Sequence, residues 1–300
     1  MGETGAVPLL YLIDALPYVF RAYFALPERL NAQGHPVHAV YGFATFLVQL
    51  LREEPLTHIG VAFDESLTTS FRNDTYPPYK ANRDLPPPEL EQQLHDCQSV
   101  ARALGLPVFA DQRYEADDLL GALAQQAVQR GLDVVVVSND KDLMQLVSPQ
   151  VSFYDFARNR RYQIDEVIAH MGVRPEQIPD LLGLQGDAVD NIPGVKGVGV
   201  KTAVALLQAF PSIEAIYANL DRVETLPIRG AKSLRRKLES ERDNAVLSKQ
   251  LATIAMDAPA VYDEEACRYR GAVASEIDPL WKQLGFERLR QRIPHWRFET

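Results

Sequence analysis

Short apolar runs alternate with amphipathic segments over roughly the first 160 residues. The apolar runs lie at 7–14, 58–64, 105–110 and 133–140, with a weaker one at 151–156. They are rich in β-branched residues and almost free of polar ones, which is typical of strands buried on both faces. Between them, 41–53, 88–104 and 116–131 carry apolar residues at helical spacing. This alternation predicts an α/β fold, with a central, mainly parallel sheet flanked by helices on both faces.

The pattern becomes helical from about residue 174. Helices are expected at 201–210, 232–240, 241–251 and 277–289, and a glycine-rich turn at 192–199 precedes the first of them. We therefore predict an α/β catalytic domain over 1–174 and a helical domain over 175–300.

The segment 76–88 interrupts the strand–helix alternation. Its sequence, YPPYKANRDLPPP, is rich in proline and carries Lys80 and Arg83. Proline fixes the backbone and removes hydrogen-bond donors, so we expect an extended, exposed loop. This loop would belong to an arch over about 72–100.

Composition describes an ordinary globular chain of 300 residues, 46% hydrophobic and 24% charged, which can bury a core without disulfides. Cys97 and Cys267 are expected to be reduced thiols of a cytoplasmic protein. The apolar run 6–13 is too short to cross a bilayer, and no signal peptide is visible. The net charge of −9 argues against a general nucleic-acid binder unless the acidic residues are gathered at one place.

Acidic residues do gather in the predicted sheet. Asp14, Asp64 and Asp140 each end a predicted strand, and the carboxyl ends of parallel strands meet at one edge of a sheet. Six more acids follow in the same half-sheet or beyond it: Glu115, Asp117, Asp118, Asp142, Asp187 and Asp190.

Helix capping could explain any one pair of these acids but explains nine poorly. A carboxylate cluster without His or Cys suits Mg²⁺ or Mn²⁺, and a pair of such ions can hydrolyse a phosphodiester. Without these nine, 31 acidic residues balance 31 basic ones.

Five sequence motifs carry a specific resemblance. They are LIDALPYVFRAYFAL (12–26), VAFDESLTTSFRNDTYPPYKANR (61–83), YEADDLLGALA (114–124), VVVSNDKDLMQLV (135–147) and LQGDAVDNIPGVKGVGVKTA (184–203). In this order they resemble the 5′-nuclease family that contains flap endonucleases and the 5′–3′ exonuclease domain of bacterial DNA polymerase I. The resemblance continues to about residue 256. It implies a PIN-like fold with an arch, and a helical DNA-binding domain that contains a helix–three-turn–helix.

The resemblance also implies roles for the acidic residues. Asp14, Asp64, Glu115 and Asp117 would form a first metal site. Asp118 and Asp140 would lie between or near both sites. Asp142, Asp187 and Asp190 would build the second site, partly through water.

Basic, aromatic and glycine residues would hold the DNA. Lys80 would stabilise the scissile phosphate, supported by Arg83, although arch lysines are often only solvated. The residues expected to contact DNA are Arg21, Tyr23, Arg72, Tyr79, Gly194, Gly197, Gly199, Lys201 and Thr202. The glycine hairpin could also bind K⁺ through its carbonyls. Residues 229–249 hold seven basic and three acidic side chains, which fits either DNA contact or a solvated helix face.

The sequence departs from the family at Ala15 and Asn139, where glycine is usual, and at Leu16-Pro17, where small polar residues are usual. We expect these departures to alter the backbone beside the metals.

The resulting prediction is a monomeric, free-standing 5′–3′ exonuclease or flap endonuclease of DNA replication or repair, in the bacterial cytoplasm near the nucleoid. It would act on DNA with 5′ flaps or 5′ ends at single-strand/duplex junctions. The alternatives are a non-catalytic DNA-binding protein on the same scaffold and a two-metal phosphatase.

Overall fold

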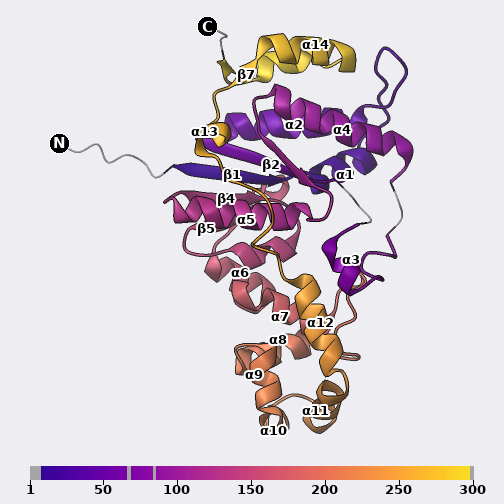
Figure 1. The fold of residues 1–300 in the computed structure, drawn as a ribbon, viewed down its shortest axis with the longest axis vertical. Coiled ribbons are helices and arrows are strands. Elements are labelled where there is room, and N and C mark those ends of the chain that lie inside the picture. Colours follow the sequence, from indigo (N-terminus) through magenta and orange to yellow (C-terminus); the bar gives the residue numbers. More distant parts are fainter. Residues whose placement is uncertain (1–7, 66–68, 84–85, 298–300) are drawn as a thin grey trace, which may run out of the picture.

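A six-stranded sheet forms the centre of the upper half of the molecule (Figure 1). The computed structural model describes residues 8–65, 69–83 and 86–297. Within them the strands are β1 (Leu9–Asp14), β2 (His58–Asp64), β3 (Val108–Asp111), β4 (Asp133–Val137), β5 (Val151–Asp155) and β6 (Arg160–Tyr162). Their order is β3-β2-β1-β4-β5-β6, and only β6 runs antiparallel to its neighbour. The predicted α/β fold class is confirmed.

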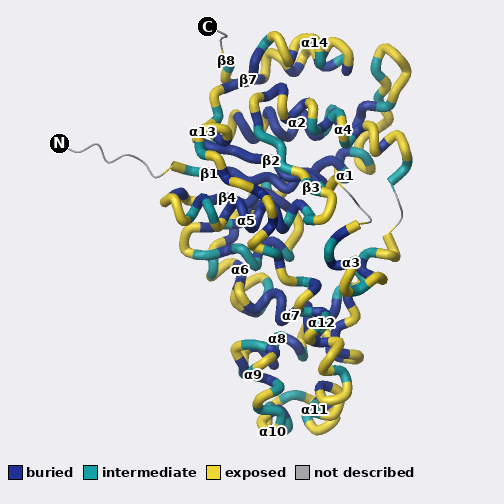
Figure 2. The backbone as a smooth tube through the Cα atoms, viewed as in Figure 1, coloured by how far each residue is buried: buried dark blue, intermediate teal, exposed yellow. Residues whose placement is uncertain are grey.

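Alternating apolar residues along each central strand bury both faces of the sheet. In β1, Leu10 and Leu12 join the core on one face, while Tyr11 and Ile13 join the core on the other. The first core is covered by α5 (Ala116–Gln129), and the second by α1 (Leu16–Ala25), α2 (His38–Glu53) and α4 (Pro88–Ala103). Figure 2 shows the sheet as buried along most of its length.

A narrower helical body lies below the sheet (Figure 1). Its helices are α6 (Ile164–Met171), α7 (Ile178–Gln185), α8 (Val200–Ala209), α9 (Ile213–Ala218), α10 (Leu220–Val223), α11 (Ala231–Ser240) and α12 (Arg242–Ala252). A glycine-rich turn joins α7 to α8, with positive φ at Gly186, Gly194 and Gly197. A Cβ on Gly194 would lie 2.3 Å from the backbone nitrogen of Gly186, so this position requires glycine.

After α12 the chain returns to the top of the molecule (Figure 1). It forms α13 (Glu264–Cys267), β7 (Ala272–Val273), α14 (Ala274–Leu284) and β8 (Trp296–Arg297). Trp281 and Phe286 belong to the core shared by the sheet, α2 and α4. The predicted helix 277–289 is thus α14, which ends at Gly285 with φ 74°, followed by a 3₁₀ turn.

The predicted loop after β2 is exposed at most of its described residues, as expected, but it folds into turns and is not extended. A short helix, α3 (Phe71–Thr75), precedes a series of turns in which Tyr79 is only 4% exposed. Residues 84 and 85 of the predicted arch, and residue 7 of the first predicted strand, lie outside the described residues.

Cys97 and Cys267 are buried free thiols, as expected. In the described ranges, no helix combines the length and apolar character needed to cross a bilayer.

Candidate active site

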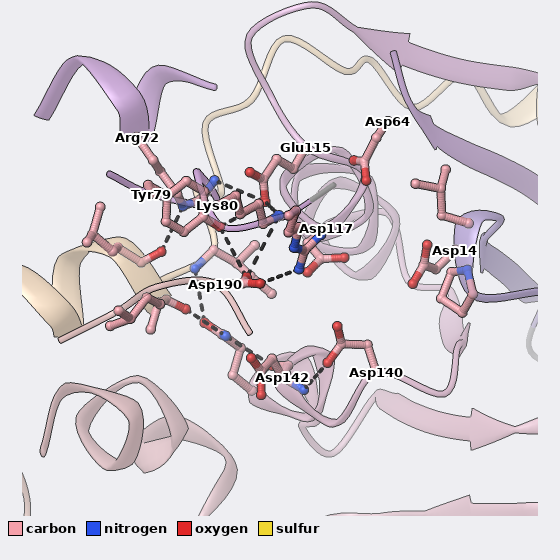
Figure 3. A pocket seen from close by; sticks show the side chains of 18 of the residues that line it. Asp14, Asp64, Arg72, Tyr79, Lys80, Glu115, Asp117, Asp140, Asp142 and Asp190 are labelled. Atoms are coloured by element: carbon pink, nitrogen blue, oxygen red, sulfur yellow. Dashed lines mark hydrogen bonds and ion pairs between the residues drawn. The ribbon is translucent and has the colours of Figure 1, made fainter. Parts of the chain in front are cut away.

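A cavity of about 250 Å³ opens at the edge of the sheet where β2, β1 and β4 end (Figure 3). Because β1 lies between β2 and β4, the strand order changes direction there, and such switch points are where α/β sheets bind ligands. The acidic residues lining this pocket are Asp14, Asp64, Glu115, Asp117, Asp140, Asp142 and Asp190. The structure therefore brings together acids that lie as far apart in the sequence as residues 14 and 190.

Hydrogen bonds at the strand ends fix the carboxylates that the sheet delivers. The hydroxyl of Ser138 donates to Asp14 at 2.7 Å. The N–H of Ala116, at the start of α5, donates to Asp64 at 2.5 Å. Asp140 caps the 3₁₀ turn that follows β4 and accepts the N–H of Asp142 at 2.9 Å.

The pocket gathers negative charge on buried side chains. Burial raises the pKa of Asp14 to about 8, and repulsion from Asp64 and Asp140 adds to this shift. Burial and the charges of Asp14 and Asp140 hold the pKa of Asp117 well above its usual range. Burial, followed by repulsion from Asp140, raises the pKa of Asp142 to about 7. A cation placed among these groups would favour their charged forms.

Lys80 and Arg83 supply positive charge on one side of the pocket only. The Lys80 ammonium lies 2.7 Å from a Glu115 oxygen and 3.8 Å from Asp190, and Arg83 also pairs with Asp190. Burial is the largest single influence on the pKa of Glu115 and would raise it, but the charges of Lys80 and Arg72 and the hydrogen bonds from Lys80 and Tyr79 together lower it.

The remaining acids of the pocket lack such partners. Among the described residues, no ion pair is formed by Asp14, Asp64, Asp117, Asp140 or Asp142. Figure 3 shows Glu115, Lys80 and Asp190 grouped together, with Asp14 and Asp140 set apart from them.

The donor set fits a divalent cation. It offers carboxylate oxygens without thiolate or imidazole, the ligands that Mg²⁺ and Mn²⁺ prefer. One oxygen of Asp142 is buried without a hydrogen-bond partner, although its neighbourhood is polar. In the part of the chain that the structure describes, no three His, Cys, Asp or Glu side chains are already arranged as a coordination sphere. Binding an ion would therefore require the carboxylates to turn toward it.

Asp118 and Arg72 form a buried ion pair, which corrects two predictions. Asp118 is fully buried outside the pocket, and its oxygens accept two N–H groups of Arg72 at 2.7 and 2.8 Å. It also accepts the backbone N–H of Glu115 and of Ala255. With its carboxylate fully used, Asp118 has no free lone pair aimed at a metal. Arg72, also bonded to the Leu251 carbonyl, is unavailable to DNA.

Tyr79 is likewise held inside the protein. Its ring packs with Ile192 and Leu251, and its hydroxyl donates to Glu115 at 3.2 Å. The ring is 4% exposed and lines the pocket, and the predicted stacking of a base on it stays a prediction. Asp187 lies beside the pocket, not in its lining. Its carboxylate accepts the N–H of Val189 at 2.8 Å, and its charge contributes to the raised pKa of Asp142.

The other predicted DNA contacts lie apart from the pocket. Arg21 is exposed on α1, and Tyr23 stacks on His38 with ring centres 5.0 Å apart. Gly199 caps α8, where Lys201 is exposed and Thr202 half-buried. Their roles, and those of Gly194 and Gly197, stay predictions.

Ser138 is the functional residue that the sequence reasoning missed. The sequence could have indicated it, because Ser138 lies directly after β4 and two residues before Asp140, and this end of β4 lies beside Asp14 in the parallel sheet. Neither Ala15 nor Asn139 takes up the left-handed backbone conformation that favours glycine. Ala15 has φ −77° and ψ −40°, and Asn139 is not among the residues with positive φ, so neither position requires glycine.

Two sequence families match this chain over consecutive ranges. The 5′-3′ exonuclease N-terminal resolvase-like domain matches residues 9–172, and the 5′-3′ exonuclease C-terminal SAM fold matches residues 173–275. DNA polymerase I of Bacillus caldotenax is 41% identical over 289 residues, covering 95% of this chain and 32% of that protein. DNA polymerase I of Pseudomonas aeruginosa is 43% identical over 249 residues, covering 83% of this chain and 27% of that protein. The chain thus spans about a third of the length of these relatives.

Solved structures share the fold. T5 5′-exonuclease with bound zinc ions has a TM-score of 0.71 at 20% identity, covering 92% of this chain and 99% of that one. The catalytic core of Rad2 in complex with a DNA substrate has a TM-score of 0.62 at 17% identity, covering 96% and 93%. At these identities the likeness establishes the fold alone. The matches over residues 9–275, together with polymerase relatives more than 40% identical, show that this chain belongs to the 5′–3′ exonuclease family.

Proposed function

We propose that this chain is a structure-selective 5′ nuclease that hydrolyses phosphodiester bonds of DNA in replication or repair. Its substrates would be 5′ flaps and 5′ ends at single-strand/duplex junctions, and its products would carry 5′ phosphates. The observation that carries the proposal is the convergence of seven acidic side chains on one pocket, with Lys80 at its side. Membership of the 5′–3′ exonuclease family gives this pocket its reaction class.

The acidic residues would hold two divalent cations, Mg²⁺ or Mn²⁺. Asp14, Asp64, Glu115 and Asp117 would serve one ion, and Asp140, Asp142 and Asp190 the other, with Asp187 acting through water. Bound there, the ions would activate a water molecule and stabilise charge on the reacting phosphate. The Ser138 hydroxyl would keep Asp14 oriented, and the N–H of Ala116 would do the same for Asp64.

Lys80 and Arg83 would bind the phosphate. Their side chains are 15% and 39% exposed beside the carboxylates, so a DNA strand reaching the pocket meets two positive charges. Charge that develops on the phosphate in the transition state is stabilised most by fixed charges in a site with little water. The contacts of Lys80 with Glu115 and Asp190 hold it in such a place.

Duplex DNA would bind the glycine turn between α7 and α8. Backbone N–H groups at the start of α8 can face phosphates, and glycines allow close approach. The carbonyls of this turn would take K⁺. Contacts of this kind read backbone and shape, so selectivity would be for structure and not for sequence.

A labelled 5′-flap duplex with Mg²⁺ tests the proposal. We expect cleavage by the unmodified protein and a loss of at least about a hundredfold in Asp64→Asn and Asp140→Asn. Asp165→Asn is the matched control, because Asp165 is exposed and lies outside the pocket. Absence of cleavage, or equal rates in all four proteins, would exclude the proposed chemistry. Binding of the flap without turnover would favour a non-catalytic DNA-binding protein.

A further inference from the structure

Two segments far apart in the sequence are joined beside the pocket. One is 78–83, which carries Lys80, and the other is 187–192, which leads into the glycine turn. We call their connection the joint. It consists of three hydrogen bonds: Lys80 N–H to the Asp190 carbonyl (3.0 Å), the Asn82 side-chain amide to the Ala188 carbonyl (2.8 Å), and the Asn191 side-chain amide to the Pro78 carbonyl (2.7 Å).

The backbone on both sides of the joint is held in an unfavourable conformation. Lys80 has φ 54° and Asn191 has φ 57°. Asparagine tolerates such an angle better than most residues, but a lysine seldom adopts it and keeps it only where surrounding contacts determine the backbone. Here the two residues sit on opposite sides of the same three hydrogen bonds.

An apolar contact and an ion pair reinforce the joint. Tyr79, directly before Lys80, packs with Ile192 from the other segment and with Leu251 of α12. Arg83 pairs with the carboxylate of Asp190. Lys80 is thus anchored on both sides to the 187–192 segment.

The 187–192 segment is in turn continuous with the glycine turn. Asp187 and Ile192 pair as an antiparallel bridge, and the N–H of Val195 bonds to the Leu184 carbonyl at the end of α7. The glycine turn and Lys80 are thus connected through the 187–192 segment.

We propose that Asn82 and Asn191 are positioning residues that couple the seating of duplex DNA on the glycine turn to the placement of Lys80. The inference rests on the proposed function and adds a regulatory link to it. With the joint intact, a longer duplex downstream of the cleavage point seats the turn and further restrains the Lys80 position that the joint already sets, which speeds the chemical step. Without the joint, the place of Lys80 no longer depends on the duplex.

The test uses the double variant Asn82→Ala/Asn191→Gly. Glycine retains the positive φ, so the change removes the side-chain bond without straining the backbone. Asn159→Gly is the matched control, because Asn159 also has a positive φ (50°), and its side-chain oxygen accepts a hydrogen bond from the hydroxyl of Tyr154. Single-turnover cleavage is measured at saturating protein on flap substrates with a short and a long downstream duplex.

We expect the wild type and the control to cleave the long-duplex substrate faster than the short one. In the double variant the rate on the long duplex should fall about tenfold, to that on the short duplex, because Lys80 is misplaced. DNA affinity should change less than about twofold, since neither asparagine is among the residues proposed to contact the duplex. An equal loss at both lengths, or no loss, would overturn the inference.

Hydrogen exchange gives a second readout that needs no cleavage. With duplex DNA and a chelator, amides in 78–83 should become protected in the wild type and in Asn159→Gly, but not in the double variant. If the wild type cleaves DNA and neither effect appears, the coupling is refuted and the proposed function stands. If the wild type neither cleaves nor binds DNA, both are refuted.

Discussion

Replacing Arg72 by methionine tests whether its buried ion pair with Asp118 joins the pocket to the helical body. Arg72 is 4% exposed and Asp118 is fully buried. Beyond the two bonds to Asp118, the guanidinium donates to two carbonyls of the helical body. One is that of Leu251, in the last turn of α12, and the other is that of Thr253, directly after the helix. Removing one member of such a pair leaves a buried charge without a partner, which costs about 3–5 kcal/mol. We expect a loss of unfolding free energy of this size.

Denaturant unfolding followed by tryptophan fluorescence measures the loss. Arg113→Met is the control: Arg113 pairs with Asp74 at 2.6 Å, but both side chains are more than 60% exposed, so the unfolding free energy should hardly change. Adding Asp118→Asn to Arg72→Met should recover part of the loss, because the unpaired charge is removed. The reasoning is refuted if the Arg72 variant loses no more stability than the Arg113 variant, or if the second substitution destabilises it further.

Three further predictions concern the pocket and the glycine turn. Lys80→Ala should lower single-turnover cleavage about a hundredfold with DNA binding retained, while Lys282→Ala, on α14, should leave the rate unchanged; equal rates would refute the role of Lys80. With a chelator present, the unfolding free energy should fall as pH rises from about 4 to about 8, because Asp14 keeps its proton in the folded state (pKa about 8) and loses it in the unfolded state (3.8). In Asp14→Asn, urea titrations at several pH values should show a shallower slope, and an unchanged slope would contradict this assignment. Gly194→Ala should destabilise the protein by more than the roughly 1–2 kcal/mol that a left-handed residue costs, and weaken DNA binding. Gly131→Ala is the control, because Gly131 has φ 85° and open space around it; its unfolding free energy should fall by only about 1–2 kcal/mol and its DNA binding should be unchanged. Equal losses of stability and of DNA binding in the two variants would count against the close packing of the turn.

The sheet could be predicted from the sequence because its strands are buried on both faces. The run at 58–64 is apolar until Asp64 and became β2 with the predicted bounds. The run at 105–110 was placed too early. Gly105 has φ 81°, and the N–H of Leu106 bonds back to the Ala101 carbonyl, so these residues close α4 before β3 begins at Val108. Local hydrophobicity does not distinguish a helix end from a strand start.

Helix α1 was not expected, because its residues are apolar on several sides and follow β1 directly. The helix begins at Leu16, and Pro17 fits in its first turn because the missing N–H of proline is not needed there.

Only the pocket residues that lie at the ends of parallel strands could be predicted from the fold pattern. Asp14, Asp64 and Asp140 follow from the parallel sheet. Asp117 and Asp118 are neighbours on a helix, where consecutive side chains diverge by about 100°, so one lines the pocket and the other points away from it. That Asp118 finds Arg72 there could not be inferred, because its partner lies 46 residues away in a segment that looked exposed.

The return of the chain to the top of the molecule has a consequence for the order of folding. Trp281 and Phe286 complete the core between the sheet, α2 and α4, although β5 ends at Asp155. During synthesis at about 5–20 residues per second, the sheet would leave the ribosome on the order of ten seconds before this last part of its core. Until the segment with Trp281 and Phe286 has been made, the new α/β half therefore exposes an apolar face of α2 and α4 to solvent.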